Sequence, residues 1–396
     1  MGTFRRQPIV ITRGQGTLVW DEDGKEYLDF TAGWAVDSLG HCPPVLVDAL
    51  REQAATLIQT SNQFYTIPQL LLAELLVEHS ALDKVFFTNS GAEAVEGAIK
   101  LARKYGKLTL DGAFQTIVAH DAFHGRTLTA VSATGTPRYQ EPFTPLTPGF
   151  VHVPFGDLDA IKQATTSQVC AILLEPVQGE GGVIVPSADY LKGVRDWCDQ
   201  HRILLMLDEI QTGMGRLGTL FGYQQFSIEP DVMALAKGLG GGVPIGAFLC
   251  KDQYNVLEPG DHGSTFGGNP LACAGAYAVA KYIIAEHVPE LDGKGVIQHA
   301  SEIGQYLKSE LEKLCVRHET ILKEVRGLGL LLAVEFQHTV AAEVVTACNN
   351  QGLLLNPVRP NAVRLMPPLT VSKREVSQAM ERFSCALETL DHTPGR

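Results

Sequence analysis

Residues 203–211 read ILLMLDEIQ, an apolar run that stops abruptly at two acidic residues. Five other apolar runs lie between residues 64 and 250, and helical patterns separate them: VFFT (85–88), TIVAH (116–120), CAILL (170–174), VMALA (232–236) and IGAFLC (245–250). Strands that lack a polar face are typical of a mostly parallel sheet covered by helices on both faces. The sequence therefore predicts an α/β fold with a mainly parallel sheet.

The two ends of the chain follow different patterns. Residues 10–30 (VITRGQGTLVWDEDGKEYLDF) contain short apolar runs broken by glycines and by a hairpin signal at Asp23–Gly24, so they predict a small β-meander. After Asn269 the pattern becomes helical, and two late runs, LLLAVEF (330–336) and AVRLMPPL (362–369), are strand candidates. We expect a large domain and a smaller α/β domain built from both chain ends. The expected ranges are 61–285 for the large domain and 1–60 with 286–396 for the small one.

Composition and charge argue against several classes of partner. The 396 residues are 45% hydrophobic and carry a formal net charge of −12 without a basic block, which disfavours nucleic acid or an anionic membrane surface. No apolar run approaches the roughly 18 residues that span a bilayer, and none follows the arginines near the N-terminus. The eight cysteines are dispersed without a CxxC pair, so neither a disulfide framework nor a zinc site is expected. These features predict a cytoplasmic protein without a bound metal.

Asp208, at the end of the quoted run, is the first candidate functional residue, because ligands of open parallel sheets bind beyond the carboxyl ends of the strands. An aspartate at the end of a buried strand is costly to ionise unless a cation or several donors meet it. A protonated pyridine nitrogen satisfies that requirement. The competing interpretation is a nucleotide-binding module, in which such an aspartate serves Mg²⁺. That module needs a GxxxxGK[ST] loop, which the sequence lacks.

Lys237 follows the VMALA run and precedes a glycine-rich loop at 238–242. Partial burial lowers the pKa of a lysine because the charged form loses hydration. The neutral amine can then form a Schiff base with an aldehyde. Taken alone, a strand-end lysine that reaches solvent is the commoner arrangement, so the interpretation of Lys237 depends on its pairing with Asp208.

The segments that follow two other strands also carry unusual residues. Ser90 and Glu93 form a capping box, and Gly91 lets backbone N–H groups approach a phosphate-sized anion, although the pattern also fits an ordinary capped helix. Phe123 offers a face for a planar ring, or packs in the core. Arg126 suits a substrate carboxylate, or forms a surface ion pair.

Further candidates follow later in the chain. His124, beside Phe123, fits a hydrogen-bonding role or a structural one. Glu180, in a glycine-rich loop, can form an ion pair with an arginine until a substrate needs that arginine. Arg364 lies in an apolar strand and needs a carboxylate partner, either Glu180 or a substrate. Ser264 and Thr265 lie between glycines, where they fit anion binding as well as a surface turn.

Six stretches, in order along the chain, are similar to the fold-type I, class III aminotransferases, which depend on pyridoxal phosphate (PLP): FFTNSGAEA, AFHGRTL, LEPVQGEGG, DEIQTGMGRLG, LAKGLGGGVPIGA and HGSTFGGNPLAC. The resemblance covers nearly the whole chain. Within the family the chain most resembles the acetylornithine group, also in the SNQFYTIPQ stretch at 61–69. The resemblance implies a large domain with a mainly parallel seven-stranded sheet, a small terminal domain and a homodimer.

The resemblance also implies roles for individual residues. Lys237 would carry the cofactor and Asp208 would face its pyridine nitrogen, which makes these two residues catalytic. The implied cofactor contacts are Gly91, Ala92, Phe123, Asp208, Glu209, Ile210, Gln211, Lys237 and, from across a dimer interface, Thr265. The implied substrate contacts are Arg126, Glu180, Ser264 and Arg364. Arg364 would bind the α-carboxylate of glutamate or 2-oxoglutarate and otherwise pair with Glu180.

The implied activity moves the distal amino group of acetylornithine, or of a related ω-amino acid, to 2-oxoglutarate by ping-pong kinetics. The products would be a semialdehyde and glutamate, and arginine biosynthesis is the implied setting. Ornithine, GABA and succinylornithine aminotransferases are alternatives within the family. An amino-mutase or racemase is another, since it would turn over one substrate without a 2-oxo acid.

Four positions depart from the usual wording of the family. Ala92 stands where threonine is frequent, and Val95 where asparagine is usual. Asp37 stands where asparagine is frequent, and after Cys42 the residue Pro44 displaces the usual His-Pro pair. Asp37 bears most on the substrate. If its carboxylate faces the pocket, it favours a cationic group over an acetylated one at the end of the donor away from the reacting amine.

Overall fold

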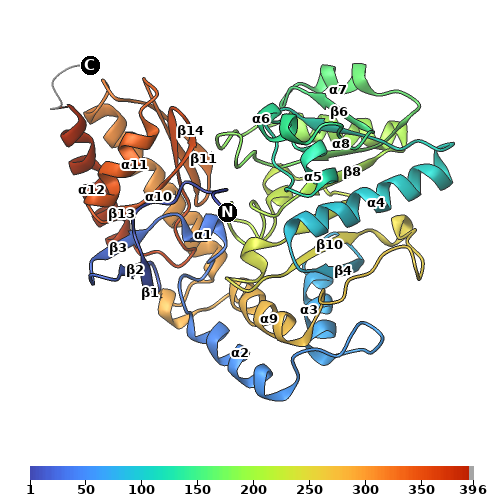
Figure 1. The fold of residues 1–396 in the computed structure, drawn as a ribbon, viewed down its shortest axis with the longest axis horizontal. Coiled ribbons are helices and arrows are strands. Elements are labelled where there is room, and N and C mark those ends of the chain that lie inside the picture. Colours follow the sequence, from blue (N-terminus) through green and yellow to red (C-terminus); the bar gives the residue numbers. More distant parts are fainter. Residues whose placement is uncertain (392–396) are drawn as a thin grey trace.

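A seven-stranded sheet is the largest sheet of the computed structural model, which describes residues 1–391 (Figure 1). The last five residues of the expected 286–396 segment lie outside this range. In spatial order the strands are β4 (Lys84–Thr88), β10 (Gly246–Cys250), β9 (Val232–Leu235), β8 (Leu204–Asp208), β7 (Val169–Leu174), β5 (Gln115–Ala119) and β6 (Phe150–Val153). Within this sheet six strands share one direction and β10 alone runs in the opposite direction. The predicted α/β fold with a mainly parallel seven-stranded sheet is confirmed.

The six apolar runs of the sequence correspond to six of these strands, with ends that differ by at most one residue. The seventh strand, β6, is not predicted by the apolar pattern. It has four residues, it pairs only with β5 at the edge of the sheet, and His152 interrupts its apolar run. Short edge strands need not be apolar on both faces, which explains why the pattern misses β6.

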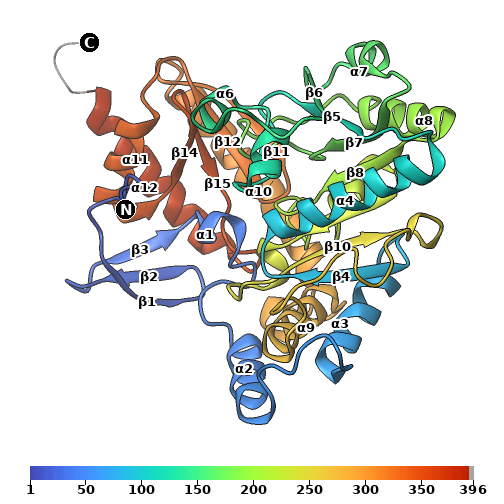
Figure 2. The ribbon, with the colours of Figure 1, turned by 45° about the vertical axis from the view of Figure 1, so that its right-hand side comes forward.

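Helices cover both faces of the large sheet (Figure 2). Along β8, Leu204 and Met206 pack in one buried cluster with α4 (Gly91–Thr109), whereas Leu205 and Leu207 pack in another with α8 (Tyr190–His201). Successive side chains of a strand point to opposite faces. The side chain of Asp208 is therefore expected on the face covered by α4, and that of Glu209 on the face covered by α8.

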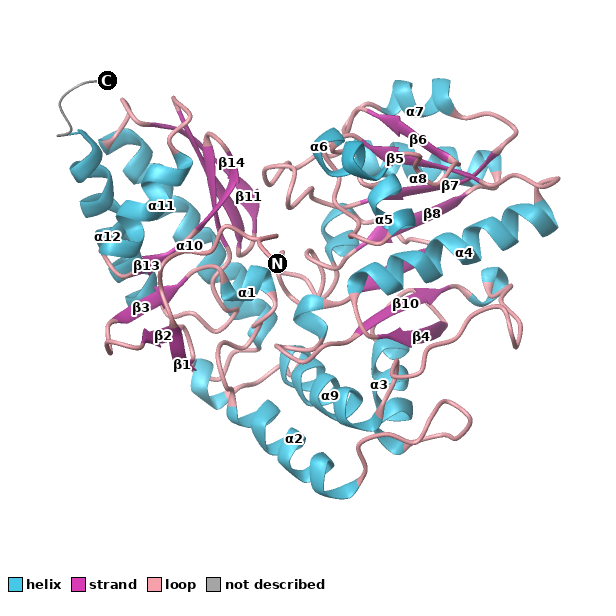
Figure 3. Ribbon diagram, in the orientation of Figure 1, coloured by secondary structure: helices cyan, strands magenta, loops and turns pink. Residues whose placement is uncertain are grey.

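The two ends of the chain form two smaller sheets beside the large one (Figure 3). The predicted N-terminal meander is present, and a short strand from near the other end of the chain joins it in parallel: β1 (Ile11–Gln15), β2 (Leu18–Asp21), β3 (Glu26–Asp29) and β13 (Leu353–Leu354). The second, which we call the C-terminal sheet, is antiparallel and contains β11 (Leu322–Leu328), β12 (Leu331–Phe336), β15 (Ala362–Leu365) and β14 (Asn356–Arg359). β12 and β15 correspond to the two late apolar runs.

The other helices pack around these sheets. α2 (Pro44–Thr56) and α3 (Ile67–Glu78) both pack against α9 (Pro270–Ile284), so the expected boundary after residue 60 falls between two helices with a shared neighbour. The rest are α5 (Leu128–Ala133), α6 (Pro137–Gln140), α7 (Leu158–Ala164), α10 (Val296–Arg317), α11 (Ala341–Asn350) and α12 (Lys373–Asp391). Within residues 1–391, no helix combines the length and apolar character needed to cross a bilayer.

The segment α1 (Ala32–Ala35) is a left-handed turn, with φ angles of 43°, 61°, 64° and 62°. Such a conformation costs about 1–2 kcal/mol for each residue other than glycine. Asp29 holds the turn: its Oδ1 accepts hydrogen bonds from the N–H groups of Thr31 (2.8 Å) and Ala32 (3.1 Å), and its Oδ2 pairs with His41 at 2.8 Å. The turn leads directly into Val36, which lines the main cavity of the molecule.

Candidate active site

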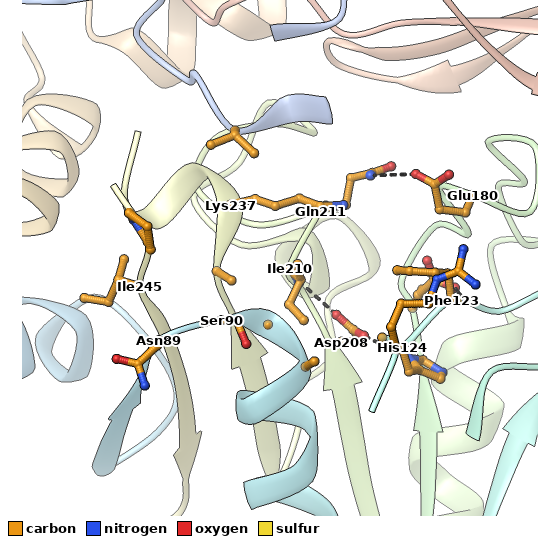
Figure 4. A pocket seen from close by; sticks show the side chains of 18 of the residues that line it. Asn89, Ser90, Phe123, His124, Glu180, Asp208, Ile210, Gln211, Lys237 and Ile245 are labelled. Carbon is orange, nitrogen blue, oxygen red and sulfur yellow. Dashed lines mark hydrogen bonds and ion pairs between the residues drawn. The ribbon is translucent and has the colours of Figure 1, made fainter. Parts of the chain in front are cut away.

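A cavity of about 470 Å³ lies beyond the carboxyl ends of the parallel strands, where ligands of such sheets bind (Figure 4). Nine of the residues predicted to bind cofactor or substrate line it: Gly91, Ala92, Phe123, Arg126, Glu180, Asp208, Ile210, Gln211 and Lys237. They come from segments far apart in the sequence. The fold therefore brings most of the predicted site together in one place.

Lys237 follows β9 and has a positive φ of 41°. Its amine makes no hydrogen bond to the rest of residues 1–391. Burial lowers the pKa of Lys237, because the ammonium form loses hydration, and the nearby carboxylate of Glu180 opposes this shift. The side chain thus presents a partly desolvated amine to the cavity, which is the property required of a nucleophilic lysine.

Asp208, at the end of β8, pairs with Ala234 of β9, three residues before Lys237, and only 3% of its surface is exposed. Its Oδ1 accepts a hydrogen bond from Ile210 N at 3.1 Å, and its Oδ2 is 2.8 Å from Nδ1 of His124. Burial alone would lower the pKa of His124, but the hydrogen bond to Asp208 raises it above its usual value. Nε2 of His124 is buried and has no hydrogen-bond partner within residues 1–391. The imidazole of His124 therefore makes a single hydrogen bond there, from Nδ1 to Asp208.

Glu209 does not line the cavity, although the resemblance implies a cofactor contact there. Its side chain continues the opposite face of β8 and accepts hydrogen bonds from Thr212 Oγ1 (2.8 Å), Gly222 N (2.7 Å) and Tyr223 N (2.6 Å). Burial raises the pKa of Glu209 to about 7. The carboxyl group therefore braces the loop after β8 from the side away from the cavity.

The N-terminus of α4 opens onto the cavity. Ser90 caps the helix by accepting a hydrogen bond from Glu93 N at 3.3 Å, and Glu93 Oε2 accepts one from Asn89 N at 2.8 Å. A Cβ on Gly91 would lie 2.7 Å from Cδ1 of Ile210, so only glycine fits there without a shift. The first N–H groups of a helix have no acceptor within the helix, and they attract anions. This edge of the cavity is suited to a phosphate group.

Arg126 and Phe123 form the wall on the side of β5. The Arg126 guanidinium lies 3.8 Å from the ring centre of Tyr139 and 5.3 Å from that of Phe123. Arg126 is exposed and makes no ion pair with residues 1–391. Its charge is therefore available to a carboxylate that enters the cavity.

Arg364, on β15, lies behind the cavity wall and is fully buried. Its Nη1 is 2.7 Å from Oε1 of Glu180 and 2.9 Å from Oε1 of Gln211, and its Nε and Nη2 have no hydrogen-bond partner within residues 1–391. Burial would raise the pKa of Glu180, but Arg364 holds it below its usual value. A ligand in the cavity meets Glu180 first and reaches Arg364 only if this pair separates.

Ser264 and Thr265 do not line the cavity of the single chain. Ser264 Oγ accepts a hydrogen bond from Nδ2 of the cavity residue Asn89 at 3.1 Å, and Asn62 Nδ2 donates to the Ser264 carbonyl at 3.0 Å. Gln59 donates to the carbonyl of Thr265. These contacts place both residues just outside the rim, next to the N-terminus of α4.

Glu175, which also lines the cavity, was not selected from the sequence. It directly follows β7, accepts hydrogen bonds from Phe123 N (3.3 Å) and Gly179 N (3.2 Å), and has a pKa raised to about 7 by burial. The rule that selected Asp208, an acid at the end of a buried strand, applies equally to Glu175. Glu180, in the same loop, is the more conspicuous acid in the sequence because glycines surround it.

Comparison with known proteins agrees with this geometry. The model of the class III aminotransferase family matches residues 3–387. The acetylornithine aminotransferase of Gloeobacter violaceus is 51% identical over 96% of this chain and 93% of its own. Among solved structures, the ornithine aminotransferase of Toxoplasma gondii, in which PLP partially occupies the active site, has a TM-score of 0.93 and 35% identity over 98% of this chain and 92% of that one.

A second solved structure, the acetylornithine aminotransferase of Elizabethkingia anophelis, has a TM-score of 0.86 and 33% identity, and it covers 98% of this chain and 96% of that one. The family match spans nearly all of the described residues, and the sequence resemblance is thereby confirmed. The chain belongs to the class III aminotransferases.

Proposed function

We propose that this chain is an acetylornithine aminotransferase that uses PLP to move the distal amino group of N-acetylornithine to 2-oxoglutarate, giving a semialdehyde and glutamate. The observation that carries the proposal is the pairing, in one cavity, of a desolvated amine on Lys237 with a buried carboxylate on Asp208. The family match and the relatives named acetylornithine aminotransferase support it.

The residues of the cavity fit PLP. The N-terminus of α4 suits the phosphate, Phe123 offers a ring face, and Gln211 lies between Lys237 and Glu180 (Figure 4). Asp208, held by Ile210 N and His124, suits a protonated pyridine nitrogen, because a buried carboxylate is stabilised by a facing cation. When bound, PLP supplies an aldehyde for the amino group and an electron-withdrawing ring.

The chain's own residues then handle protons and charge. The lowered pKa of Lys237 leaves more of its amine neutral near pH 7, so Lys237 Nζ can attack a carbonyl carbon and later accept or return a proton at the substrate carbon. Asp208 would hold the pyridine nitrogen of the cofactor, and the hydrogen bond from His124 fixes the orientation of its carboxylate.

Two arginines would sort the substrates by their carboxylates. Arg126 is exposed at the cavity and suits the single carboxylate of acetylornithine, whereas 2-oxoglutarate carries a second carboxylate, for which Arg364 is the available cation. Glu180 pairs with Arg364 at 2.7 Å. The donor would therefore meet the neutral pair at this end of the cavity, whereas the acceptor would displace Glu180 and meet the charge of Arg364.

The position of Asp37 gives no reason to prefer ornithine over the acetylated donor. Asp37 does not line the cavity, and its Oδ2 lies 3.7 Å from Nδ1 of His41. Asp37 could select a cationic donor only if its carboxylate lined the pocket, and it does not. The curated relative named acetylornithine aminotransferase reaches 51% identity, which supports the acetylated donor. The two solved structures, at 33% for the acetylornithine enzyme and 35% for the ornithine enzyme, do not separate the donors.

We further propose that the protein works as a cytoplasmic homodimer in arginine biosynthesis. Large exposed apolar side chains lie along the segment between α2 and α3 and at the start of α3, including Phe64 (63% exposed), Tyr65 (87%) and Ile67 (73%). Asn62 of the same segment is bonded to Ser264, and Phe266 beyond it is 61% exposed. An apolar surface of this kind supports burial against a second subunit, which would bring Thr265 to the partner's phosphate site.

A panel of donors with 2-oxoglutarate tests the proposal. Purified protein loaded with PLP would be given N-acetylornithine, ornithine, GABA and succinylornithine, and glutamate formation would be followed with each. We expect N-acetylornithine to have the highest kcat/KM. Asp37→Asn is the matched variant, and it should leave the ranking unchanged because Asp37 faces His41. A ranking led by ornithine or GABA would contradict the proposal, and turnover of a single substrate without 2-oxoglutarate would indicate a mutase or racemase.

A further inference from the structure

The loop that carries Glu180 has only two internal backbone hydrogen bonds, from Gly182 N (3.4 Å) and Val183 N (3.3 Å) to the Gly179 carbonyl. Gln178 and Ile184 exchange backbone hydrogen bonds of 3.1 and 3.0 Å, which closes a short loop over residues 179–183. Three of these five residues are glycines, and glycine has little preference for any one backbone conformation. The bonds within the loop leave the Gly181 and Gly182 carbonyls to partners from outside it, so the position of the Glu180 carboxylate also depends on those outside contacts.

Two arginines of the C-terminal sheet make these contacts. Arg359, on β14, donates from Nε to the Gly181 carbonyl at 2.5 Å, and its Nη2 pairs with Asp121 at 3.1 Å. Arg326, on β11, donates from Nε to the Gly182 carbonyl at 2.7 Å. The two guanidinium groups thus hold the two carbonyls that directly follow Glu180 in the chain.

Both arginines are held in place by acids outside the loop. Nη1 of Arg326 is 2.9 Å from Glu324 and also pairs with Glu335, both on the C-terminal sheet. Asp121, the partner of Arg359, instead follows β5 of the large sheet. The loop is therefore fixed by two guanidinium groups that acids hold in turn. Arg359 comes from the C-terminal sheet and is held by an acid that follows a strand of the large sheet, so it connects the two sheets.

Gly182 has the geometry that this contact requires. Its φ of +114° is rarely adopted by other residues, and a Cβ on it would lie 2.7 Å from Nε and 3.0 Å from Cδ of Arg359. A side chain at this position would push the guanidinium away from the loop. The close approach of Arg359 to the backbone thus depends on glycine.

We propose that Arg326 and Arg359 are positioning residues that hold Glu180 on Arg364 and thereby set the preference between an ω-amino donor and a dicarboxylate. This inference rests on the proposed function. Arg364 is fully buried and lies 2.7 Å from Glu180, so a second carboxylate reaches it only after Glu180 moves. A loop held by the two arginines favours the paired state, in which the cavity admits the donor. A released loop uncovers Arg364 and favours the dicarboxylate.

The test compares two ligands on the PLP-loaded enzyme. Arg359→Met keeps an unbranched side chain but removes both polar contacts. We expect the Kd of glutarate, an unreactive dicarboxylate, to fall by about three- to tenfold in calorimetry, a modest range because Arg359 is partly exposed. The KM for the ω-amino donor should rise by a similar factor. Arg359→Lys, which keeps one donor, should restore part of the wild-type balance.

Lys313→Met is the control, because it breaks an exposed ion pair with Glu310 on α10 and touches neither the loop nor the acids that anchor Arg326 and Arg359. It should leave both constants at the wild-type values. If Arg359→Met weakens glutarate and donor together, or changes neither, Arg359 has no role in the preference and the proposal is overturned.

A second variant covers the case in which Arg359→Met folds poorly. Asp121→Asn removes only the partner of Nη2, at a side chain that is 57% exposed, and it should shift both constants in the same directions by a smaller factor. The absence of any shift would again overturn the proposal. Glutarate binding does not need turnover, so a failure of the proposed function, seen as no activity of the wild type with any ω-amino donor, is recognised separately.

Discussion

The two ends of the cavity are built in different ways. At one end, Asp208 is the last residue of β8 and Lys237 follows β9. These two adjacent strands of the large sheet pair as far as Asp208 and Ala234. At the other end, Glu180 lies on a glycine-rich loop, and its partner Arg364 comes from a separate sheet. The first end has a geometry set by continuous strands, and the second has one set by contacts across the molecule. The fold thus separates a fixed chemical centre from an adjustable site for substrate selection.

The largest effect is expected at the fixed end. Lys237→Ala should reduce transamination by about 10²–10⁴-fold or more, because it removes both the nucleophile and the proton carrier. Borohydride reduction of the PLP-loaded protein should label wild type and leave the variant unlabelled. Lys251→Ala is the control, since Lys251 makes a surface pair with Glu229 at 3.3 Å. A labelled peptide that contains any other lysine would contradict this assignment.

Asp208→Asn, at the same end, should lower kcat by about 10²-fold or more. The substitution should also lower the pKa of His124, because burial depresses it and the Asp208 carboxylate is the main group that raises it, with a smaller contribution from Glu175. The imidazole signals of His124 in an NMR titration report this second effect without any turnover. An unchanged His124 titration would show that the 2.8 Å contact with Asp208 is not retained in solution.

At the adjustable end the expected effect is smaller and selective. Arg364→Met should raise the KM for 2-oxoglutarate by about 10- to 100-fold, the loss of a charge-assisted contact of about 1.5–3 kcal/mol. The KM for N-acetylornithine should change much less, since Arg126 suits its carboxylate. Half-reactions followed separately with each substrate would measure the two constants. An equal rise in both would mean that the two ends do not act independently.

The smallest effect concerns Glu209, beside the fixed end but outside the cavity. Its folded-state pKa of about 7 exceeds the usual value of 4.5, so the folded state binds the proton more tightly. Stability must therefore fall as the pH rises from about 4.5 to 7, by at most about 1.4 kcal/mol for each unit. Glu209→Gln cannot titrate, so the loss of Tm between pH 5 and pH 7.5 should roughly halve.

The remaining pH dependence of that variant is expected from Glu175, whose pKa is also raised to about 7. The variant should be less stable than wild type at every pH, because a glutamine offers one acceptor oxygen to three donors. The difference in Tm between the two pH values is therefore the measurement, not the Tm itself. A variant with the full wild-type loss would show that Glu209 does not titrate in this range.

The fixed end is the part of the site that the sequence predicts well. Asp208 and Lys237 can be recognised because an apolar strand and the residue after it are local in the chain, and strand ends of a parallel sheet meet at one edge. The direction of Glu209 was equally predictable in principle, since it follows from the alternation along β8 that points Leu205 and Leu207 to the far face.

The adjustable end is much less visible in the sequence. Nothing near Arg326 or Arg359 indicates that their side chains reach carbonyls more than 140 residues earlier in the chain. The left-handed turn at Ala32–Ala35 is equally hidden, because only one of its four residues is a glycine. Contacts of this kind depend on how separate sheets are placed, which local patterns do not encode.

The parallel pairing of β3 with β13 has a consequence for biosynthesis. Leu28 emerges from the ribosome long before its partner Leu353, and at about 5–20 residues per second the delay is on the order of tens of seconds. During that time β3 exposes an unpaired edge and the buried residues Leu28 and Phe30. The nascent chain must therefore be shielded until translation is nearly finished, and trimming either terminus would leave the other without its partner strand.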